Sequence, residues 1–358
     1  MSQKVYGDSG KWTVIFYANQ DRIGAGNSII VPGQSIRIPC LSGERALPVE
    51  ATATATVSAP TTITQSGLVD RLEFLTADDY APFTDRALSG GGLITDVVAS
   101  AMAELNKDEK INIGHKISWV NDWSAHLNPL LTTRAFDLGF PWFKPPCENF
   151  DALDKSAQFR CRRLFFSDPI FEPLILFFVK KDSTFNFRND AEVAGRSICR
   201  PAGYFTFDLD QDGRNWVKDN KVTMVQPPSV EACFRLLESG SVDAVALNEF
   251  TGRAAMAKIG LTDQVRAIER PVSITALRIV VSKTHPHART MLHYVNSALR
   301  KLRETGRFDR IVEKHLTRYW DSLAEQERAA KAAAAAAKTK KKVADNAASE
   351  TNESGSTE

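Results

Sequence analysis

Short apolar runs alternate with amphipathic segments between residues 71 and 305, and this alternation constrains the fold more than any other feature. Such alternation is typical of α/β architectures with mainly parallel sheets. Because ligands bind at the carboxyl ends of parallel strands, functional residues are expected in the loops that follow them. Strands are expected at Arg71–Leu75, Ile111–Trp119, Phe136–Phe140, Leu174–Val179, Ser197–Cys199, Thr223–Val225, Ala244–Leu247 and Ala276–Val281. Helices are expected at Ile94–Leu105, Ser229–Glu238, Glu249–Ile259 and Ala288–Thr305.

The chain has 358 residues, more than one hydrophobic core usually organises, so we expect two compact units with appendages. In residues 44–66 the apolar residues have no helical or strand spacing that would let the segment bury one face, so these residues are expected to form a linker. Residues 323–358 are alanine-rich and then polar, which predicts a low-complexity tail, transiently helical and largely disordered. Folded pieces are therefore expected at 1–43 and 67–322.

Composition excludes some function classes. A net charge of +2 produces no strong positive electrostatic potential of the kind that indicates nucleic-acid binding. The short cluster Lys338–Lys342 is more typical of a solvated tail. No run approaches the roughly 18–20 apolar residues that span a bilayer. The six histidines do not cluster with the cysteines, so no metal or other cofactor is expected.

The five cysteines allow two interpretations. Cys147 lies close to Cys161, and Cys199 close to Cys233, as expected for local disulfides in an oxidising compartment. Scattered buried thiols fit the same spacing equally well. The spacing leaves both open, and Cys40 is unpaired in either case.

Several loose motifs occur in a fixed order along residues 70–322. They are Tyr80-Ala81-Pro82-Phe83, Gly92-Leu93 before Asp96, Trp123 with Leu127 and Leu131 before Asp137, Arg160 seven residues before Ser167, and Leu237 to Ala244. In this order they resemble the periplasmic amino-acid-binding proteins, solute-binding protein family 3 of ABC importers. The resemblance implies a two-lobed, type II periplasmic-binding fold, with lobe 1 at 67–180 and 283–322 and lobe 2 at 181–282.

The same resemblance implies a binding protein without catalysis. It would capture an amino acid or related carboxylate by closing its two lobes and deliver it to an ABC permease. Two other classes stay open: an enzyme on this scaffold, for which Glu249 is the candidate acid or base, and a sensory or wall-anchored binding module.

Candidate ligand contacts follow from the motifs. Tyr80 can offer a flat apolar wall, and Arg160 can clamp a carboxylate, although a surface arginine beside Arg162 and Arg163 is an equal alternative. Phe83, Trp123 and Trp142 line the site or pack behind it. In the second lobe the candidates are Tyr204, Thr206, Asn248 and Glu249.

Two departures from the family pattern concern the ligand. Pro141-Trp142-Phe143-Lys144 stands where relatives carry small hydroxyl residues. Asn248, followed by Glu249, stands where relatives carry an aspartate for the ligand's amino group. Since an amide cannot neutralise an ammonium, either Glu249 takes that role or the ligand is not a plain α-amino acid.

The first 43 residues resemble the second half of a lysin-motif (LysM) domain, a partial α+β module. The resemblance rests on Asn19 and on Pro32-Gly33-Gln34 followed by Ile36, Ile38 and Pro39. It implies peptidoglycan as a partner. It also implies a true start upstream of Met1, with an export signal and a periplasmic or extracytoplasmic location, which favours disulfides over thiols.

Two segments imitate other sites. Asp208 to Gly213 copies the start of an EF-hand loop, but the twelfth position is Asp219, so we expect an acidic turn. Gly90 to Gly92 lacks the context of a phosphate-binding loop and is expected to form a turn.

Overall fold

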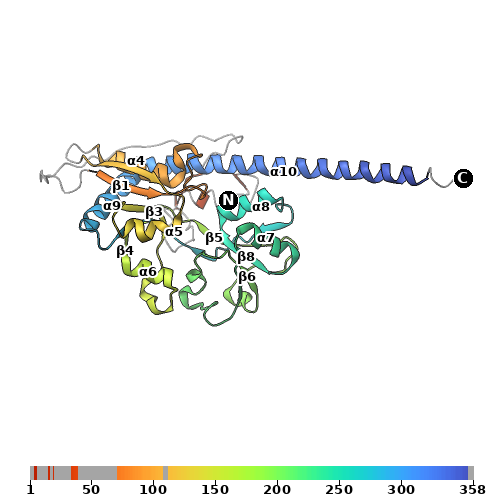
Figure 1. The fold of residues 1–358 in the computed structure, drawn as a ribbon, viewed down its shortest axis with the longest axis horizontal. Helices are drawn as coiled ribbons and strands as arrows, with labels where there is room; N and C mark the ends of the chain where they lie inside the picture. The colour runs from red at the N-terminus through yellow and green to blue at the C-terminus, as the bar shows by residue number, and fades with distance from the viewer. Residues whose placement is uncertain are drawn as a thin grey trace. The chain divides into compact units, whose positions relative to one another are not determined.

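The computed structural model describes residues 4–5, 15–16, 19, 34–38, 71–107 and 112–353. The chain divides into two compact units (Figure 1). Unit 1 contains Met1–Ile175, Thr206–Gly213 and Val272–Arg318, and unit 2 contains Leu176–Phe205, Arg214–Pro271 and Tyr319–Glu358. The chain therefore passes between the units after Ile175, Phe205, Gly213, Pro271 and Arg318.

Unit 1 is built on a five-stranded sheet in the order β2-β1-β3-β11-β4. β1 pairs in parallel with β2 and β3, whereas β11 is antiparallel to β3 and β4. Helices α4 (Leu93–Leu105) and α9 (Ala288–Glu304) pack against each other. The strands are β1 (Arg71–Thr76), β2 (Gly114–Trp119), β3 (Leu138–Phe143), β4 (Leu164–Phe166) and β11 (Leu277–Ser282).

Shorter elements connect these strands, and sequence patterns did not predict them. Helix α6 (Lys155–Arg163) begins where the Asp154 carboxylate accepts a hydrogen bond from the amide of Ala157, which satisfies one free donor of the first turn. The others are η2 (Ser89–Gly91), α5 (Trp123–Ala125), η3 (His126–Leu131) and η4 (Cys147–Ala152).

Unit 2 carries most of a six-stranded sheet in the order β10-β5-β8-β6-β7, with β9 paired to β5. β6 is parallel to β7 and β8. The strands are β5 (Leu174–Lys180), β6 (Ser197–Cys199), β7 (Thr223–Val225), β8 (Ala244–Asn248), β9 (Val265–Ala267) and β10 (Ser273–Ile274). A short 3-10 turn lies at η5 (Asp190–Val193) in unit 2, whereas η6 (Phe207–Leu209) and η7 (Gln211–Gly213) belong to unit 1.

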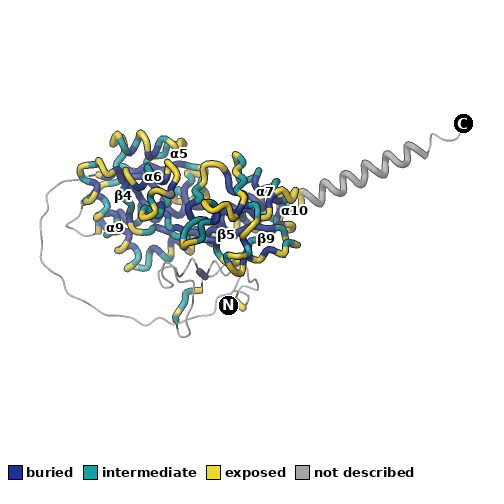
Figure 2. Tube along the Cα trace, turned by 90° about the horizontal axis from the view of Figure 1, so that it is seen from below, coloured by how far each residue is buried: buried dark blue, intermediate teal, exposed yellow. Residues whose placement is uncertain are grey.

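Two helices of unit 2 show complete start and stop signals. Helix α7 (Val230–Ser239) starts at Ser229, whose hydroxyl accepts from the Ala232 amide, and ends at Gly240 in the left-handed region. Helix α8 (Glu249–Ile259) begins after Asn248. Buried residues concentrate along the strands of each unit (Figure 2). The expected α/β class, with two units each built on its own sheet, is confirmed.

Helix α10 (Arg307–Glu353) is the last described element (Figure 1). It includes residues from 323 onward, for which the expectation of a low-complexity, transiently helical and largely disordered tail stays a prediction. Alanine, lysine and glutamate are strong helix formers. The helix is also anchored in unit 2, because the Tyr319 hydroxyl donates to the Phe250 carbonyl at 2.8 Å. Among the described residues, no helix is long and apolar enough to cross a membrane.

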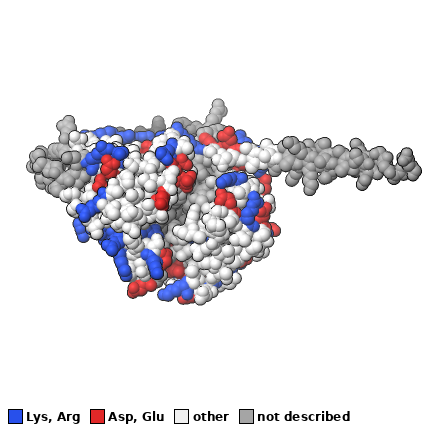
Figure 3. All heavy atoms as spheres, in the orientation of Figure 1, with Lys and Arg blue, Asp and Glu red and all other residues white. Residues whose placement is uncertain are grey.

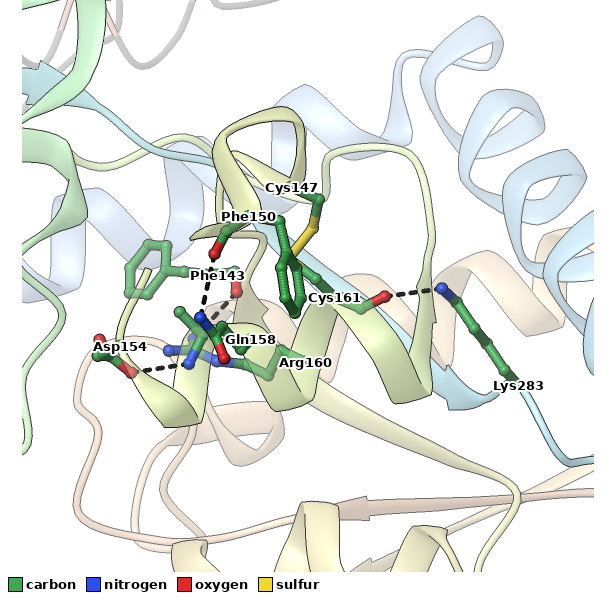
Figure 4. Close-up of a disulfide and its surroundings, with 9 residues drawn as sticks. Phe143, Cys147, Phe150, Asp154, Gln158, Arg160, Cys161 and Lys283 are labelled. Atoms are coloured by element: carbon green, nitrogen blue, oxygen red, sulfur yellow. Dashed lines mark hydrogen bonds between the residues drawn. A yellow bond between two sulfur atoms is a disulfide. The ribbon is translucent and has the colours of Figure 1, made fainter. Parts of the chain in front are cut away.

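Both expected disulfides form. Cys147 is bonded to Cys161, and Cys199 to Cys233. The first joins η4 to α6, as Figure 4 shows, and the second joins β6 to α7. Cys40 lies outside the described residues.

Most of the LysM-like segment also lies outside the described residues, so its fold and any peptidoglycan binding stay predictions. The Asn19 amide, fully buried, donates to the carbonyls of Ile15 and Arg37. The Arg37 amide donates back to Asn19 at 2.6 Å, and the Arg37 guanidinium pairs with Asp309 of α10 at 2.9 Å. These contacts tie residues 34–38 to α10 within unit 1.

Gly252 allows α8 to pack directly on the ring of Phe178 in β5. An added Cβ would lie 2.1 Å from Phe178 Cζ, far inside contact distance. We expect Gly252→Ala to destabilise the protein by about 1–3 kcal/mol in urea unfolding. Adding Phe178→Leu should recover part of this loss. Lys258→Ala, exposed on the same helix, is the control, and equal unfolding midpoints for Gly252→Ala and Lys258→Ala would contradict the packing described.

The bond between Cys199 and Cys233 closes a loop of 34 residues. Cross-linking a loop of this length restricts the unfolded chain, so the double substitution to alanine should cost about 2–4 kcal/mol of unfolding free energy. Urea unfolding of the double-alanine variant and the unmodified chain measures the difference. An unchanged midpoint would show that the bond contributes nothing.

Candidate functional site

The loops after β1 and β2 meet at one edge of the unit 1 sheet, because parallel strands end on the same side. Asp78, after β1, joins them. Its carboxylate accepts from the Asn121 amide at 2.9 Å, and its own backbone amide donates to the Asn121 side chain. The same carboxylate pairs with Arg86. A hydrogen-bonded network therefore holds the two loops at fixed spacing.

The start of α4 positions the Tyr80 loop. The backbone amides of Leu93 and Ile94 donate to the carbonyls of Pro82 and Phe83 at 2.8 and 2.9 Å. Gly92 makes this approach possible, since a Cβ there would lie 2.6 Å from the Phe83 carbonyl oxygen. The first amides of α4 are thus committed to the loop. The glycine run is a turn that packs backbone on backbone.

Four aromatic side chains predicted as ligand contacts come together in unit 1. The Trp123 ring lies 6.2 Å from Tyr80 and 5.7 Å from Trp142, both edge to face. Tyr80 also lies 4.9 Å from Phe83. Phe83 has no exposed surface, so it packs behind Tyr80, whereas the other three are half-buried. Tyr80, Trp123 and Trp142 therefore form a continuous aromatic wall.

His126 belongs to this cluster, although sequence patterns did not single it out. Its ring lies 4.9 Å from Trp123 and is fully buried. Nε2 lies 2.7 Å from the Val120 carbonyl, which can only accept, so Nε2 carries the proton. Nδ1 is buried without a partner. Burial lowers the pKa of His126, against the opposing influence of this hydrogen bond and of Asp122.

Arg160, in helix α6, contacts the backbone of β3 next to Trp142. Its guanidinium Nη1 donates to the carbonyl of Phe143, the neighbour of Trp142, at 3.2 Å (Figure 4). The residue is only 8% exposed, and Nε has no hydrogen-bond partner. No carboxylate among the described residues forms an ion pair with it. Burial lowers the pKa of Arg160, with Asp154 acting weakly in the other direction.

The burial of Arg160 bears on the surface alternative, whereas its role in ligand binding stays a prediction. A surface arginine would be solvated, as the exposed neighbours Arg162 and Arg163 are. Arg160 is instead a buried cation whose donors are only partly used. Such a group is costly to bury unless an anion completes it. Ring contacts connect Tyr80 to Trp123 and Trp123 to Trp142. Arg160 donates to the backbone carbonyl of Phe143, the residue after Trp142.

The remaining candidates are separated by the division into units. Tyr204 is 40% exposed in unit 2, whereas Thr206 belongs to unit 1. Arg200, missed by the sequence interpretation, is buried after β6 and donates to the carbonyls of Ala246 and Phe205. The sequence does contain a signal for Arg200, because a charged residue directly follows a strand that is buried.

Asn248 and Glu249 are used inside unit 2. The Asn248 amide caps α8, accepting from the Thr251 amide at 3.0 Å and donating to the Thr251 hydroxyl at 2.8 Å. Glu249 is fully buried, and its Oε1 pairs with Arg253 at 2.8 Å, leaving Oε2 without a partner. Arg253 neutralises the one carboxylate considered for a ligand ammonium or for acid–base chemistry.

The segment that imitates an EF-hand forms two short 3-10 turns. Asp208 is fully buried and accepts from the Ser273 hydroxyl at 2.8 Å. Within the described part of the chain, no group of three or more potential metal ligands comes together.

No protein-family model and no curated protein matches the chain. Solved structures do. A variant of ArgBP from T. maritima superposes with a TM-score of 0.46 at 21% identity, over 69% of this chain and 96% of that chain. The substrate binding protein of an amino acid ABC transporter matches with a TM-score of 0.47 at 19% identity, over 68% and 98%. The periplasmic VFT2 domain of BvgS from Bordetella pertussis matches with a TM-score of 0.49 at 15% identity, over 69% and 92%. Similarity at this level carries no ligand or partner over to this chain.

Acidification tests the neutral state of His126. Because its folded pKa lies below the unfolded value, its stabilising contribution is complete above about pH 6.5 and is lost as the pH falls below that value. His126→Gln, which keeps a donor for Val120 but does not titrate, should lose less unfolding free energy between pH 7.5 and 5.5 than the unmodified chain. Each unit of pKa difference corresponds to about 1.4 kcal/mol.

Urea unfolding at both pH values measures this loss. His115 and His285, whose pKa values burial also lowers, add a background that both proteins share. The exposed His293→Gln is the control. An equal loss of stability in His126→Gln and the unmodified chain would contradict the neutral assignment.

Proposed function

We propose that this chain is the solute-binding component of an ABC importer and that it captures an amino acid or a related carboxylate. The observation that carries the proposal is the buried Arg160 guanidinium, with Nε unpartnered and no carboxylate paired to it among the described residues. A ligand carboxylate would complete this cation with charge-assisted hydrogen bonds from its fork of donors.

The aromatic wall supports the same function. Tyr80, Trp123 and Trp142 are half-buried, so each keeps a surface on which a ligand can stack. Large rings give contact area at small entropic cost, while one charged group fixes orientation. The bulk of Trp142 replaces the small hydroxyl donors expected at that position, so Arg160 has to provide most of the carboxylate recognition in unit 1.

The surroundings of Asn248 and Glu249 bear on the other end of the ligand. Thr251 occupies the Asn248 amide, and Arg253 neutralises Glu249. We therefore propose a ligand whose recognition depends on its carboxylate more than on an ammonium. The two disulfides support an oxidising, extracytoplasmic location, with the permease as the partner of the loaded protein.

Replacing Arg160 tests the function. Arg160→Met keeps the volume and removes the charge, and it should weaken binding of the best carboxylate ligand by about 100-fold or more, because a buried charged hydrogen bond is lost. Arg160→Lys should weaken it by about tenfold, since lysine keeps the charge without the fork. Isothermal titration, after a thermal-shift screen of amino acids and carboxylates, measures both.

Stability without ligand separates binding from folding. Since Arg160→Met removes a buried, incompletely paired charge, its unfolding temperature should equal or exceed that of the unmodified chain. Lys155→Ala, exposed on the same helix, is the matched control and should bind normally. No ligand-dependent shift for the unmodified chain across the panel, or full affinity in Arg160→Met, would remove the proposal.

A further inference from the structure

A cluster of basic side chains covers one face of unit 1 where α6, β4 and α9 come together. We define this basic face as Arg162, Arg163, Lys283, Arg289 and Arg300. All five side chains are exposed. In Figure 3 the Lys and Arg atoms gather over the region where Figure 1 labels α9, β4 and α6.

Three of these residues lie over two phenylalanine rings, and a backbone hydrogen bond ties in a fourth, Arg163. Lys283 and Arg289 lie 5.4 and 5.1 Å from the centre of the Phe165 ring in β4. The Lys283 amide donates to the Arg163 carbonyl, and its ammonium to the Cys161 carbonyl, both at 2.7 Å. Arg162 lies 4.5 Å from the centre of the Phe150 ring. The fold therefore places these exposed side chains, although the Lys283 ammonium already donates to the Cys161 carbonyl.

Acidic residues do not balance this face. None of the five forms an ion pair with a described carboxylate, whereas arginines elsewhere in the chain commonly do, as Arg214 and Arg270 do with Asp190. Helices α6 and α9 together contain one acidic residue, Glu304. Other exposed acids border these elements, namely Asp154 at the start of α6, Glu148 and Asp151 in η4, and Asp168 after β4, but none of them forms an ion pair with the five cations. The concentration of charge contrasts with the net charge of +2 for the whole chain.

Spacing indicates an extended anionic partner. Arg289 and Arg300 lie eleven residues apart on one side of α9, which separates them by about 16 Å along the helix. One small anion cannot reach both. The apolar residues of α9, such as Met291, Val295 and Leu299, are buried inside unit 1, so the face would act through charge without inserting into a bilayer.

We propose that the basic face docks unit 1 reversibly on the surface of an anionic phospholipid bilayer. Four of its five cations are arginines, whose forked donors match phosphate oxygens in pairs. A bilayer presents many phosphates in one plane, so separated arginines are satisfied together. The interaction is peripheral and electrostatic, and it adds to the proposed ligand binding without depending on it.

Vesicle sedimentation tests the docking. The full chain should bind vesicles of phosphatidylcholine with about one third phosphatidylglycerol, should not bind pure phosphatidylcholine, and should dissociate as NaCl rises, because salt screens exposed charges. Changing Arg162, Arg163, Lys283 and Arg289 to glutamine should lower the partition coefficient several hundred-fold, at about fivefold per basic residue.

Controls separate charge from folding. Lys218, Lys221, Arg235 and Lys258, all in unit 2, changed to glutamine give the same net charge and should leave binding within about twofold. The pair Arg162→Gln with Arg163→Gln, both at exposed positions, should still lose about 25-fold if the larger variant is unstable. Equal binding to neutral and anionic vesicles, equal loss in both fourfold variants, or binding to polyglutamate without binding to vesicles would overturn the proposal.

Discussion

Parallel pairing of β1 with β2 and β3 is the constraint on which the candidate site depends. It brings the ends of three strands to one edge of the unit 1 sheet, so residues far apart in sequence can share a wall. Tyr80 follows β1, Trp123 follows β2, and Trp142 is the next-to-last residue of β3. Asp78 and the first amides of α4 then fix the loops, so the rings are held by hydrogen bonds behind them.

Arg160 adds a buried positive charge to the candidate site. A buried guanidinium is unfavourable for folding, and the protein offsets it only partly through the Phe143 carbonyl. The same incompleteness is the basis of the proposed carboxylate recognition. Glu249 shows the opposite solution in unit 2, where Arg253 on the next turn neutralises a fully buried carboxylate. The Glu249 charge is therefore neutralised within the fold, whereas the Arg160 charge has no such partner among the described residues.

Sequence patterns predicted the regular elements well because burial imposes clear periods on them. All eight expected strands and all four expected helices are present. The two expected disulfides are present as well. Elements without a period were missed, including α6, whose amphipathic signal is obscured by three arginines. The start of α10 was missed as well, and the hydrogen bond of the Tyr319 hydroxyl to Phe250 is a tertiary contact that composition does not reveal. Among site residues, Asn248 and Glu249 matched a family position, but Thr251 and Arg253 already engage them. Such pairing depends on tertiary neighbours, which spacing cannot show.

The bond between Cys147 and Cys161 has a consequence for how this protein is produced. Cys161 follows Arg160 directly, so the cross-link that holds α6 to η4 also restrains the backbone beside the proposed carboxylate-binding cation. Material made in a reducing cytosol lacks that restraint, and it also lacks the bond between Cys199 and Cys233 that stabilises unit 2. An unresponsive sample therefore has to be assayed for free thiols before its ligand panel is judged.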